Sequence, residues 1–204
     1  MPIEIINVEQ GTPEWFKARA GIPTASEFSS VLAKGQGRTR RAYMLRLAGE
    51  RITGEPGETF TSPAMERGRL MEEDARREYQ FLFDADPVQV GFVRNQSAGC
   101  SPDSFLGDAG GIEIKTKRAD LQIDVLLSDE VPSEHKAQLQ GFLWVCEREW
   151  VDFISFWPGL PLFVKRVTRD EDYIKMLSDE VDRFNQETDA IVAQIRRYGM
   201  KEAA

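Results

Sequence analysis

The sequence has few of the side chains that most often bind transition metals. Cys100 and Cys146 are the only cysteines and form no C-x-x-C pair, and His135 is the only histidine. This spacing gives no support for a zinc site or an iron–sulfur cluster, and a single histidine excludes a histidine-based metal cluster. We expect the two cysteines to be buried thiols and His135 to be a polar helix residue rather than a catalytic base.

Long hydrophobic runs are also missing. No stretch approaches the roughly 20 apolar residues that a transmembrane helix needs, and the opening segment MPIEIINVEQ lacks the basic and apolar regions of a secretory signal. We therefore expect a cytoplasmic protein that makes no contact with a membrane.

Positive charge is in the minority. The chain has 26 Lys and Arg residues against 34 Asp and Glu, which gives a net charge of -8. Such a balance argues against a protein that coats DNA without regard to sequence. It is compatible with a nucleic-acid enzyme, because carboxylates at a metal site add negative charge while a local basic surface still binds a phosphate backbone.

The length and composition fit one domain over residues 1–204. Hydrophobic residues make up 41% of the chain, enough for a buried core. Apolar spacing predicts a helical N-terminal part over about 10–54 and a long C-terminal helix over about 170–197. The remaining segment, about 62–168, is expected to form the main core.

The order of elements within this core predicts an α/β fold. The expected elements are a helix over 62–83, strands at 88–94, 99–106 and 111–117 with a hairpin turn at 107–110, a polar irregular stretch, a helix from 132, and β-rich segments at 150–157 and 162–168. Helix, three strands, helix and strand in this order predict a mixed sheet flanked by helices.

Two short helices are expected before the core. Thr12 is a typical N-cap for a helix over about 13–20, and Gly21 is a plausible stop. The segment Thr24-Ala25-Ser26-Glu27 has the pattern of a capping box, so a second helix is expected to begin at Thr24.

The clearest chemical pattern lies in Gly111-Ile112-Glu113-Ile114-Lys115. A strand alternates its side chains, so Glu113 and Lys115 share one face. Asp103 lies on the preceding hairpin strand and is expected to pair close to Glu113. Carboxylates that bind Mg²⁺ or Mn²⁺, together with a lysine, suit phosphodiester hydrolysis. The alternative is a solvated strand face with an ordinary Glu–Lys pair, which E-x-K alone does not exclude.

Glu72 is a further candidate from the helix before the strands. It is adjacent to Met71 in an apolar stripe, so it can lie at the border of the buried face. Several acidic residues crowd the same helix, and the pattern alone does not choose among them.

The chain resembles the PD-(D/E)xK nuclease superfamily through Asp103, Glu113 and Lys115, and its element order resembles the αβββαβ, restriction-endonuclease-like core. Within that superfamily it resembles the phage lambda-exonuclease, or YqaJ-like viral recombinase, family, over most of residues 10–157. The matching stretches are WFKARAGIPTASEF at 15–28, RGRLMEEDAR at 67–76, SPDSFLGDAGGIEIK at 101–115 and AQLQGFLWV at 137–145.

The resemblance implies a metal site. Carried over by position, Asp103 and Glu113 are the metal ligands with Glu72 nearby, and the backbone carbonyl of Ile114 adds a ligand. The implied cofactor is Mg²⁺, with Mn²⁺ as a possible substitute and two ions expected.

The resemblance also implies two further catalytic residues. Lys115 orients the attacking water, and Gln138 corresponds to the active-site glutamine of the family, although it also reads as a polar residue of an amphipathic helix. Two positions depart from the family pattern. Ser104 stands where a glycine usually follows the aspartate, and His135 stands where a tyrosine is common, which puts the local loop geometry in question.

A phosphate site is expected near the turn over residues 21–24. The N–H groups at the following helix start, the Ser26 hydroxyl and the Arg19 guanidinium suit an anion, with Thr24 at the helix start. The alternative is a capping box beside a surface arginine. The resemblance assigns the arginine and the serine to the terminal 5′ phosphate of DNA.

A basic cluster follows at Arg38, Arg40 and Arg41, before a helical stretch that ends near Gly54. These arginines are candidates for contact with the duplex backbone. A solvated basic turn explains them equally well.

The residues alone support metal-assisted phosphodiester hydrolysis. The resemblance adds a 5′-to-3′ exonuclease on double-stranded DNA that produces 3′ single-stranded tails for annealing-type recombination. It also implies a ring-shaped homotrimer, a phage single-strand annealing protein as partner, and action in the cytoplasm of a bacterial host. The alternatives are another PD-(D/E)xK enzyme, such as an endonuclease, or a non-catalytic scaffold that binds DNA ends.

Overall fold

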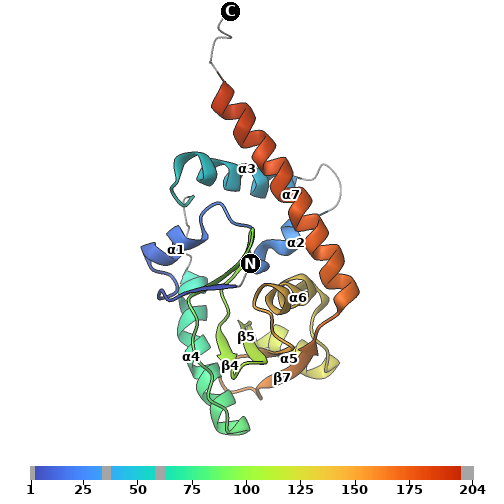
Figure 1. Cartoon of the computed structure of the whole chain (residues 1–204). Helices are drawn as coiled ribbons and strands as arrows, with labels where there is room; N and C mark the ends of the chain where they lie inside the picture. The colour runs from blue at the N-terminus through green and yellow to red at the C-terminus, as the bar shows by residue number, and fades with distance from the viewer. Residues whose placement is uncertain (1–2, 34–37, 58–62, 199–204) are drawn as a thin grey trace, which may run out of the picture.

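Figure 1 shows the computed structural model of the chain, which describes residues 3–33, 38–57 and 63–198. Ser62, the expected first residue of the helix over 62–83, lies outside these ranges. In chain order the elements are β1 (Glu4–Ile6), α1 (Pro13–Arg19), the 3₁₀ turn η1 (Ala25–Glu27), α2 (Phe28–Val31), α3 (Arg38–Thr53), α4 (Pro63–Phe83), β2 (Phe92–Asn95), β3 (Ala98–Cys100), β4 (Ser104–Leu106), β5 (Gly110–Thr116), α5 (Ala119–Ser128), the 3₁₀ turn η2 (Ser133–His135), α6 (Lys136–Val145), β6 (Trp150–Phe156), β7 (Phe163–Thr168) and α7 (Glu171–Arg197).

A four-stranded mixed sheet forms the centre of the fold, in the order β4-β5-β6-β7. Strands β5 and β6 are parallel, and the other two pairings are antiparallel. A parallel pair needs a long crossover, and α5 and α6 provide it. The expected mixed α/β sheet flanked by helices is therefore confirmed.

Helices cover both faces of this sheet. On one face α4 packs Ala75 and Tyr79 into a cluster with Ile112 and Ile114 of β5. On the other face α6 packs against the strands, and a Cβ added at Gly111 would lie only 2.4 Å from the Phe142 ring. The glycine therefore allows α6 to approach β5 closely. This alternation leaves Glu113 on the α6 side of the sheet, as its position between Ile112 and Ile114 predicts.

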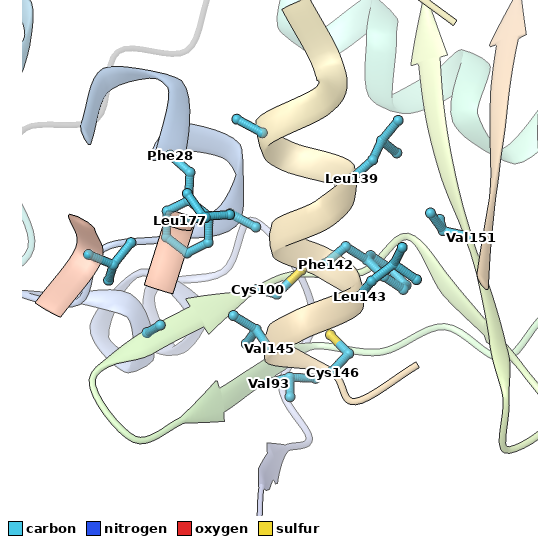
Figure 2. Close-up of a cluster of buried hydrophobic side chains, with 14 of the residues drawn as sticks. Phe28, Val93, Cys100, Leu139, Phe142, Leu143, Val145, Cys146, Val151 and Leu177 are labelled. Carbon is cyan, nitrogen blue, oxygen red and sulfur yellow. The ribbon is translucent and has the colours of Figure 1, made fainter. Parts of the chain in front are cut away.

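Helix α6 is the centre of the larger hydrophobic cluster. Figure 2 shows its side chains between Phe28 on one side and Val151 of the sheet on the other, with Cys100 and Cys146 nearby. Both cysteines are buried free thiols, as expected. Helix α7 runs across α3 (Figure 1) and adds Leu177 to this cluster.

The expected strand over 99–106 is wrong as a single element. It is split into β3, which joins a separate three-stranded sheet in the order β1-β2-β3, and β4, which joins the four-stranded sheet. The break includes Pro102, which has no N–H to donate to a strand ladder. Of the expected strand over 88–94, Val88 forms only an isolated bridge to Phe105, and regular pairing begins at Phe92.

Helix α5 occupies the stretch that the sequence suggested to be irregular. Its inner face contains a fully buried glutamine, Gln122, which donates to the carbonyl oxygens of Ser155 and Pro161, while Leu121 and Leu127 are exposed. This reversal of the usual apolar stripe explains why periodicity did not predict the helix.

The helix starts were predicted with mixed success. The Thr12 side chain accepts from the Trp15 N–H, so this N-cap is confirmed, and Gly21 follows the helix with φ +72°. The capping box at Thr24 does not form, because Thr24 makes no side-chain cap bond and a 3₁₀ turn precedes α2. Within the described ranges, no helix combines the length and apolar composition that crossing a membrane requires.

Candidate active site

Glu113 and Lys115 form an ion pair on the α6 side of β5. The Lys115 ammonium donates to Glu113 Oε1 over 2.7 Å, and the Gln138 side-chain amide donates to the same oxygen. Glu113 is buried and Lys115 is partly buried. The structure therefore brings together three of the predicted residues, two from β5 and Gln138 from α6.

Asp103 joins this group through the β4–β5 hairpin. Ser104 pairs with Ile112, and continuing that register by one residue puts Asp103 opposite Glu113. The Asp103 carboxylate accepts the Ile114 N–H over 2.6 Å, which fixes it beside the strand. The proximity to Glu113 expected from the hairpin is thus present.

Glu72 approaches the same group from α4. The helix comes close to the end of β5, because Gly68 leaves room for Thr116, whose hydroxyl would lie 3.1 Å from an added Cβ. Glu72 lies one turn further along α4 and faces the charges of Glu113 and Lys115. Glu72 is therefore the acidic residue of α4 whose charge interacts with Glu113 and Lys115, a choice that the periodicity alone did not make.

Crowding of negative charge makes these carboxyl groups hard to ionise. Burial, followed by the charges of Glu113 and Glu72, raises the pKa of Asp103 well above its usual range. Burial and Glu113 also raise the pKa of Glu72. Burial opposes the charge on Lys115, but Glu113 and Asp103 outweigh it and raise the pKa of that ammonium. A cation bound beside these carboxylates would relieve their repulsion.

The donor set suits a hard divalent cation. Asp103 and Glu113 offer carboxylate oxygens and Ile114 offers a backbone carbonyl, the ligand types that Mg²⁺ prefers. In the part of the chain that the structure describes, no three Asp, Glu, His or Cys side chains form a ready-made metal site. A smaller set still fits Mg²⁺, which commonly uses one or two protein carboxylates and keeps several waters.

The carboxylates border a large cleft. Glu72 and Asp103 line a cavity of about 1260 Å³, and the same cavity is lined by Arg19, Thr24 and Ser26. The two sites predicted separately from the sequence thus share one cleft. A bound molecule that spans it would contact the carboxylate group and the predicted phosphate site together.

Arg19 is held at the cleft by uncharged partners. Its guanidinium donates to the Ser101 hydroxyl over 2.6 Å and lies 4.0 Å from the centre of the Trp15 ring. The Trp15 indole N–H donates to the same hydroxyl. Burial lowers the pKa of Arg19, and the opposing charge of Glu27 is too weak to cancel this effect. The surface arginine considered as an alternative is therefore not what the structure contains.

Thr24 and Ser26 differ in exposure. Ser26 is exposed at the cleft, and its hydroxyl lies 3.3 Å from that of buried Thr24. The Thr24 N–H is not free for an anion, because it donates to the Tyr43 hydroxyl over 3.0 Å. The expectation of free N–H groups at this helix start is thus wrong for Thr24, and a 3₁₀ turn of three residues replaces the expected helical start.

The basic cluster is not brought to the cleft. Arg40 makes a two-pronged ion pair with Glu187 of α7, at 2.6 and 3.0 Å, and its Nε–H donates to the Val31 carbonyl. Arg38 and Arg41 are exposed on α3. None of the three is among the residues that line the cavity. Arg40 therefore fastens α3 to α7, and DNA contact by Arg38 and Arg41 remains a prediction.

His135 lies in the 3₁₀ turn before α6 and is half-buried. Its ring lies against Phe153, with centroids 5.1 Å apart. Burial, Lys117 and Lys115 lower the pKa of His135 to about 4, so the imidazole is neutral at neutral pH. The residue is more buried than a polar helix residue was expected to be.

The sequence analysis did not identify Arg76, which lines the cleft, or Ser101, which holds two residues that line it. Ser101 accepts from both Trp15 and Arg19. Arg76 is buried beside Ser104 and follows Glu72 by four residues. That i, i+4 spacing puts Arg76 on the face of α4 that carries Glu72, which was a usable signal. Nothing local to Ser101 indicates its partners, which come from α1.

Comparisons with known proteins identify the family of the chain. Residues 14–149 match the model of the YqaJ-like viral recombinase domain. Two crystal structures of the alkaline exonuclease LHK-Exo from Laribacter hongkongensis, one of them in complex with dAMP, superpose with TM-scores of 0.83 and 0.84 at 31% and 32% identity. Each superposition covers 91% of this chain and 97% of the other. Among curated proteins, none matches the chain.

A more distant structure supports the fold. The phage-related exonuclease from Haemophilus somnus 129PT superposes with a TM-score of 0.64 at 12% identity, covering 85% of this chain and 96% of the other. The restriction-endonuclease-like fold that the resemblance implied is thus confirmed. Nucleases of this kind generally use divalent metal ions. The matched domain covers more than half of the chain, and the chain therefore belongs to the YqaJ-like viral recombinase family and is an exonuclease of the lambda type.

Proposed function

We propose that the protein is a Mg²⁺-dependent 5′-to-3′ exonuclease that digests double-stranded DNA and leaves 3′ single-stranded tails for annealing-type recombination. The observation that supports this most strongly is the shared cleft, with Asp103 and Glu72 at one part of its wall and the buried Arg19 at another. The dAMP bound to LHK-Exo supports a deoxynucleotide product. In this proposal residues 1–204 act as one nuclease domain.

Asp103 and Glu113 are proposed to hold the metal, with Glu72 nearby and the Ile114 carbonyl as a further ligand. We propose Mg²⁺, with Mn²⁺ as a substitute and two ions in the active complex. When bound, the metal supplies Lewis-acid stabilisation of negative charge on the phosphate. The raised pKa values of Asp103 and Glu72 support this assignment, because a nearby cation favours their ionised forms.

Lys115 is proposed to orient the attacking water. Its ammonium is held by Glu113 over 2.7 Å, which restricts the long side chain to one side of β5. Gln138 is proposed to fix the Glu113 carboxylate through its amide hydrogen bond. Both residues thus act on the carboxylate that would face the scissile phosphate.

Arg19 and Ser26 are proposed to bind the terminal 5′ phosphate, with Thr24 supporting the Ser26 hydroxyl. The Arg19 guanidinium is half-buried and donates to a neutral hydroxyl, so a doubly charged phosphate would add a charge-assisted contact that the Ser101 hydroxyl does not provide. Anchoring the 5′ end in the cleft that contains the carboxylates would give digestion its direction. Arg38 and Arg41 are left as candidates for weaker backbone contacts.

A duplex with one labelled end tests the activity. We expect Mg²⁺-dependent release of mononucleotides from the 5′ end of linear DNA, no cleavage of a closed circle, and full inhibition by EDTA. Cleavage of the circle would instead indicate an endonuclease. Binding to DNA ends without nucleotide release in either Mg²⁺ or Mn²⁺ would indicate a non-catalytic scaffold and would contradict the proposal.

We further propose that the chain forms a ring-shaped homotrimer. A net charge of -8 gives little diffuse attraction to DNA, whereas a closed ring retains its substrate by enclosing it. The exposed Leu121, Ile123 and Leu127 of α5 are apolar side chains available to a neighbouring subunit. Residues 170–197 offer a second surface. A phage annealing protein is the proposed partner, in the cytoplasm of a bacterial host.

Light scattering tests the assembly. At micromolar concentration we expect a mass near three times 23.2 kDa. A monomer mass that persists in the presence of DNA and Mg²⁺ would refute the ring. The exonuclease proposal is independent of this result, since a monomer with the same cleft can still release nucleotides.

A further inference from the structure

Arg76 is a buried arginine in the wall of the cleft. It lies on α4 with 9% of its surface exposed, four residues after Glu72. Within the described residues its side chain donates two hydrogen bonds, and both go to the segment formed by Asp103 and Ser104. The Arg76 guanidinium therefore ties α4 to the segment that carries Asp103.

The hydrogen bonds form a relay to the main chain of Asp103. The Arg76 Nε–H donates to the Ser104 hydroxyl over 3.1 Å, and that hydroxyl donates to the Asp103 carbonyl oxygen over 2.5 Å. Arg76 Nη2 also reaches the same carbonyl at 3.5 Å. Ser104 is fully buried. The relay therefore fixes the main chain of Asp103, and with it the position from which the carboxylate side chain extends.

The same arginine is close to the other carboxylate of the cleft. Its charge favours the ionised form of Glu72, in opposition to Glu113. Glu72 and Asp103 repel each other, and they come from α4 and from the start of β4. Arg76 thus connects the two segments whose carboxylates would otherwise separate.

We propose that Arg76 and Ser104 are positioning residues that hold Asp103 at a fixed place relative to Glu72, and thereby set the affinity of the cleft for a divalent cation. This inference rests on the proposed function. The Ser104 hydroxyl is the group that links the Arg76 guanidinium to the Asp103 carbonyl, and a residue without a hydroxyl at this position would break the relay.

Two other roles for Arg76 predict different results. An arginine that contacts DNA would affect the KM for duplex ends and leave cation binding unchanged. An arginine that acts only on the metal by its charge would weaken cation binding, so its removal would tighten that binding. Positioning predicts the opposite sign, because loss of the relay loosens a ligand.

The test measures Mn²⁺ binding to the full chain by calorimetry, without DNA, together with the Mg²⁺ concentration that gives half-maximal nucleotide release. The variants are Ser104→Ala, which removes the hydroxyl without changing charge, and Arg76→Met. Partners behind metal ligands typically alter affinity about 10–100-fold. We expect weakening of about tenfold for Ser104→Ala and more for Arg76→Met, with the same change in both measurements.

Arg77→Met is the matched control. Arg77 is the next residue on α4, is exposed and pairs with Asp74, so the variant loses the same charge without touching β4. We expect Mn²⁺ affinity to stay within about twofold of the wild type, because an exposed charge is screened. The double variant of Arg76 and Ser104 should be no weaker than Arg76→Met alone, since both changes break one relay.

Unchanged Mn²⁺ affinity in Ser104→Ala, or tighter binding in Arg76→Met, would overturn the inference. The melting temperature of each variant is measured. If Ser104→Ala melts below the assay temperature, Ser104→Gly, which also lacks the hydroxyl, replaces it. Failure of the proposed function is distinguishable, because the wild type itself would then bind no Mn²⁺ and release no nucleotide.

Discussion

The two parts of the cleft bury charge of opposite sign. Near β5, Asp103 and Glu72 are carboxyl groups whose pKa values are raised by burial and by the charge of Glu113. Near α1, Arg19 is a guanidinium whose pKa burial lowers, with a hydroxyl and an indole ring as its neighbours. Each part is thus poorly compensated within the chain itself, in opposite directions.

This difference indicates what each part binds. Burying a charge without a partner costs free energy, so folded proteins usually pair such groups. Arg40 shows the ordinary arrangement in the same molecule, because Glu187 pairs with it and raises its pKa. Arg19 donates to a neutral hydroxyl, and Lys115 offsets the charge of the carboxylate group only in part, because the pKa values of Asp103 and Glu72 stay raised. A phosphate at Arg19 and a metal ion at Asp103 would supply it, which fits a DNA end that spans the cleft.

The largest effect is expected at the carboxylate part. Lys115→Ala should lower the rate of nucleotide release by about 10²–10⁴-fold, the range for loss of a positioned group that handles the reacting water. Asp103→Ala should reduce it to background, because a metal ligand is lost. Release of mononucleotides from a labelled duplex measures both.

Asp108→Ala is the control for this experiment. Asp108 is an exposed aspartate in the turn of the same hairpin, and its bond to Arg148 uses only its backbone carbonyl. We expect this variant to digest DNA at the wild-type rate. Activity of Lys115→Ala near the wild-type level would remove Lys115 from the mechanism.

The next effect concerns the phosphate part. Arg19→Ala should remove a charge-assisted contact of about 1.5–3 kcal/mol, so the preference for a 5′-phosphorylated duplex over a hydroxyl-ended one should fall by roughly tenfold or more. The ratio of rates on the two substrates is measured within each variant and so does not depend on the amount of folded protein.

Lys17→Ala is the matched change on the same helix. Lys17 is exposed and does not line the cleft, so its loss should keep the substrate preference. Equal rates on both ends for the wild type would contradict the phosphate assignment. A preference that survives in Arg19→Ala would do so as well.

A smaller effect is expected on stability. Because the pKa of Asp103 is raised in the folded state, its ionisation opposes folding, and the stability of the metal-free protein falls as the pH rises toward that pKa. Asp103→Asn cannot ionise and should raise the free energy of unfolding by ~1 kcal/mol at pH 8. Urea unfolding in EDTA measures this. A gain at pH 5 as large as at pH 8 would show that charge is not the cause.

The smallest effect on stability is expected for the ion pair between Arg40 and Glu187. Arg40 lowers the pKa of Glu187, so this contribution to stability is present above the usual glutamate pKa and is lost as the pH falls through the lowered value. Glu187→Gln should cost less than about 1 kcal/mol at pH 7, since the pair is partly exposed, and less at pH 3. Nucleotide release should be unaffected. A cost that is equal at both pH values would contradict the ion-pair explanation.

Much of the fold followed from local patterns. Alternation predicted β5 with Ile112 and Ile114 on one face, and the Gly107–Gly110 turn predicted the hairpin that carries Asp103. Apolar spacing predicted α7, which the structure has over Glu171–Arg197. These features are set by backbone geometry over a few residues, so sequence is sufficient for them.

Other elements depended on distant partners. β1 pairs with β2, about 90 residues later, and is too short to show a period of its own. Gln122 can lie on the buried face of α5 because the carbonyl oxygens of Ser155 and Pro161 accept hydrogen bonds from its side-chain amide. The strand over 99–106 divides because its two halves join different sheets.

By itself, the sequence determined the kinds of groups in the site and the shared face of Glu113 and Lys115, because strand geometry fixes that face. Periodicity did not choose among the acids of α4, and the tertiary structure shows that Glu72 is the one whose charge acts on Asp103 and that Arg19 lines the same cleft. It also pairs Arg40 with Glu187, 147 residues away, which no local pattern indicated. Contacts over such separations depend on how helices and sheets pack, which no local period encodes.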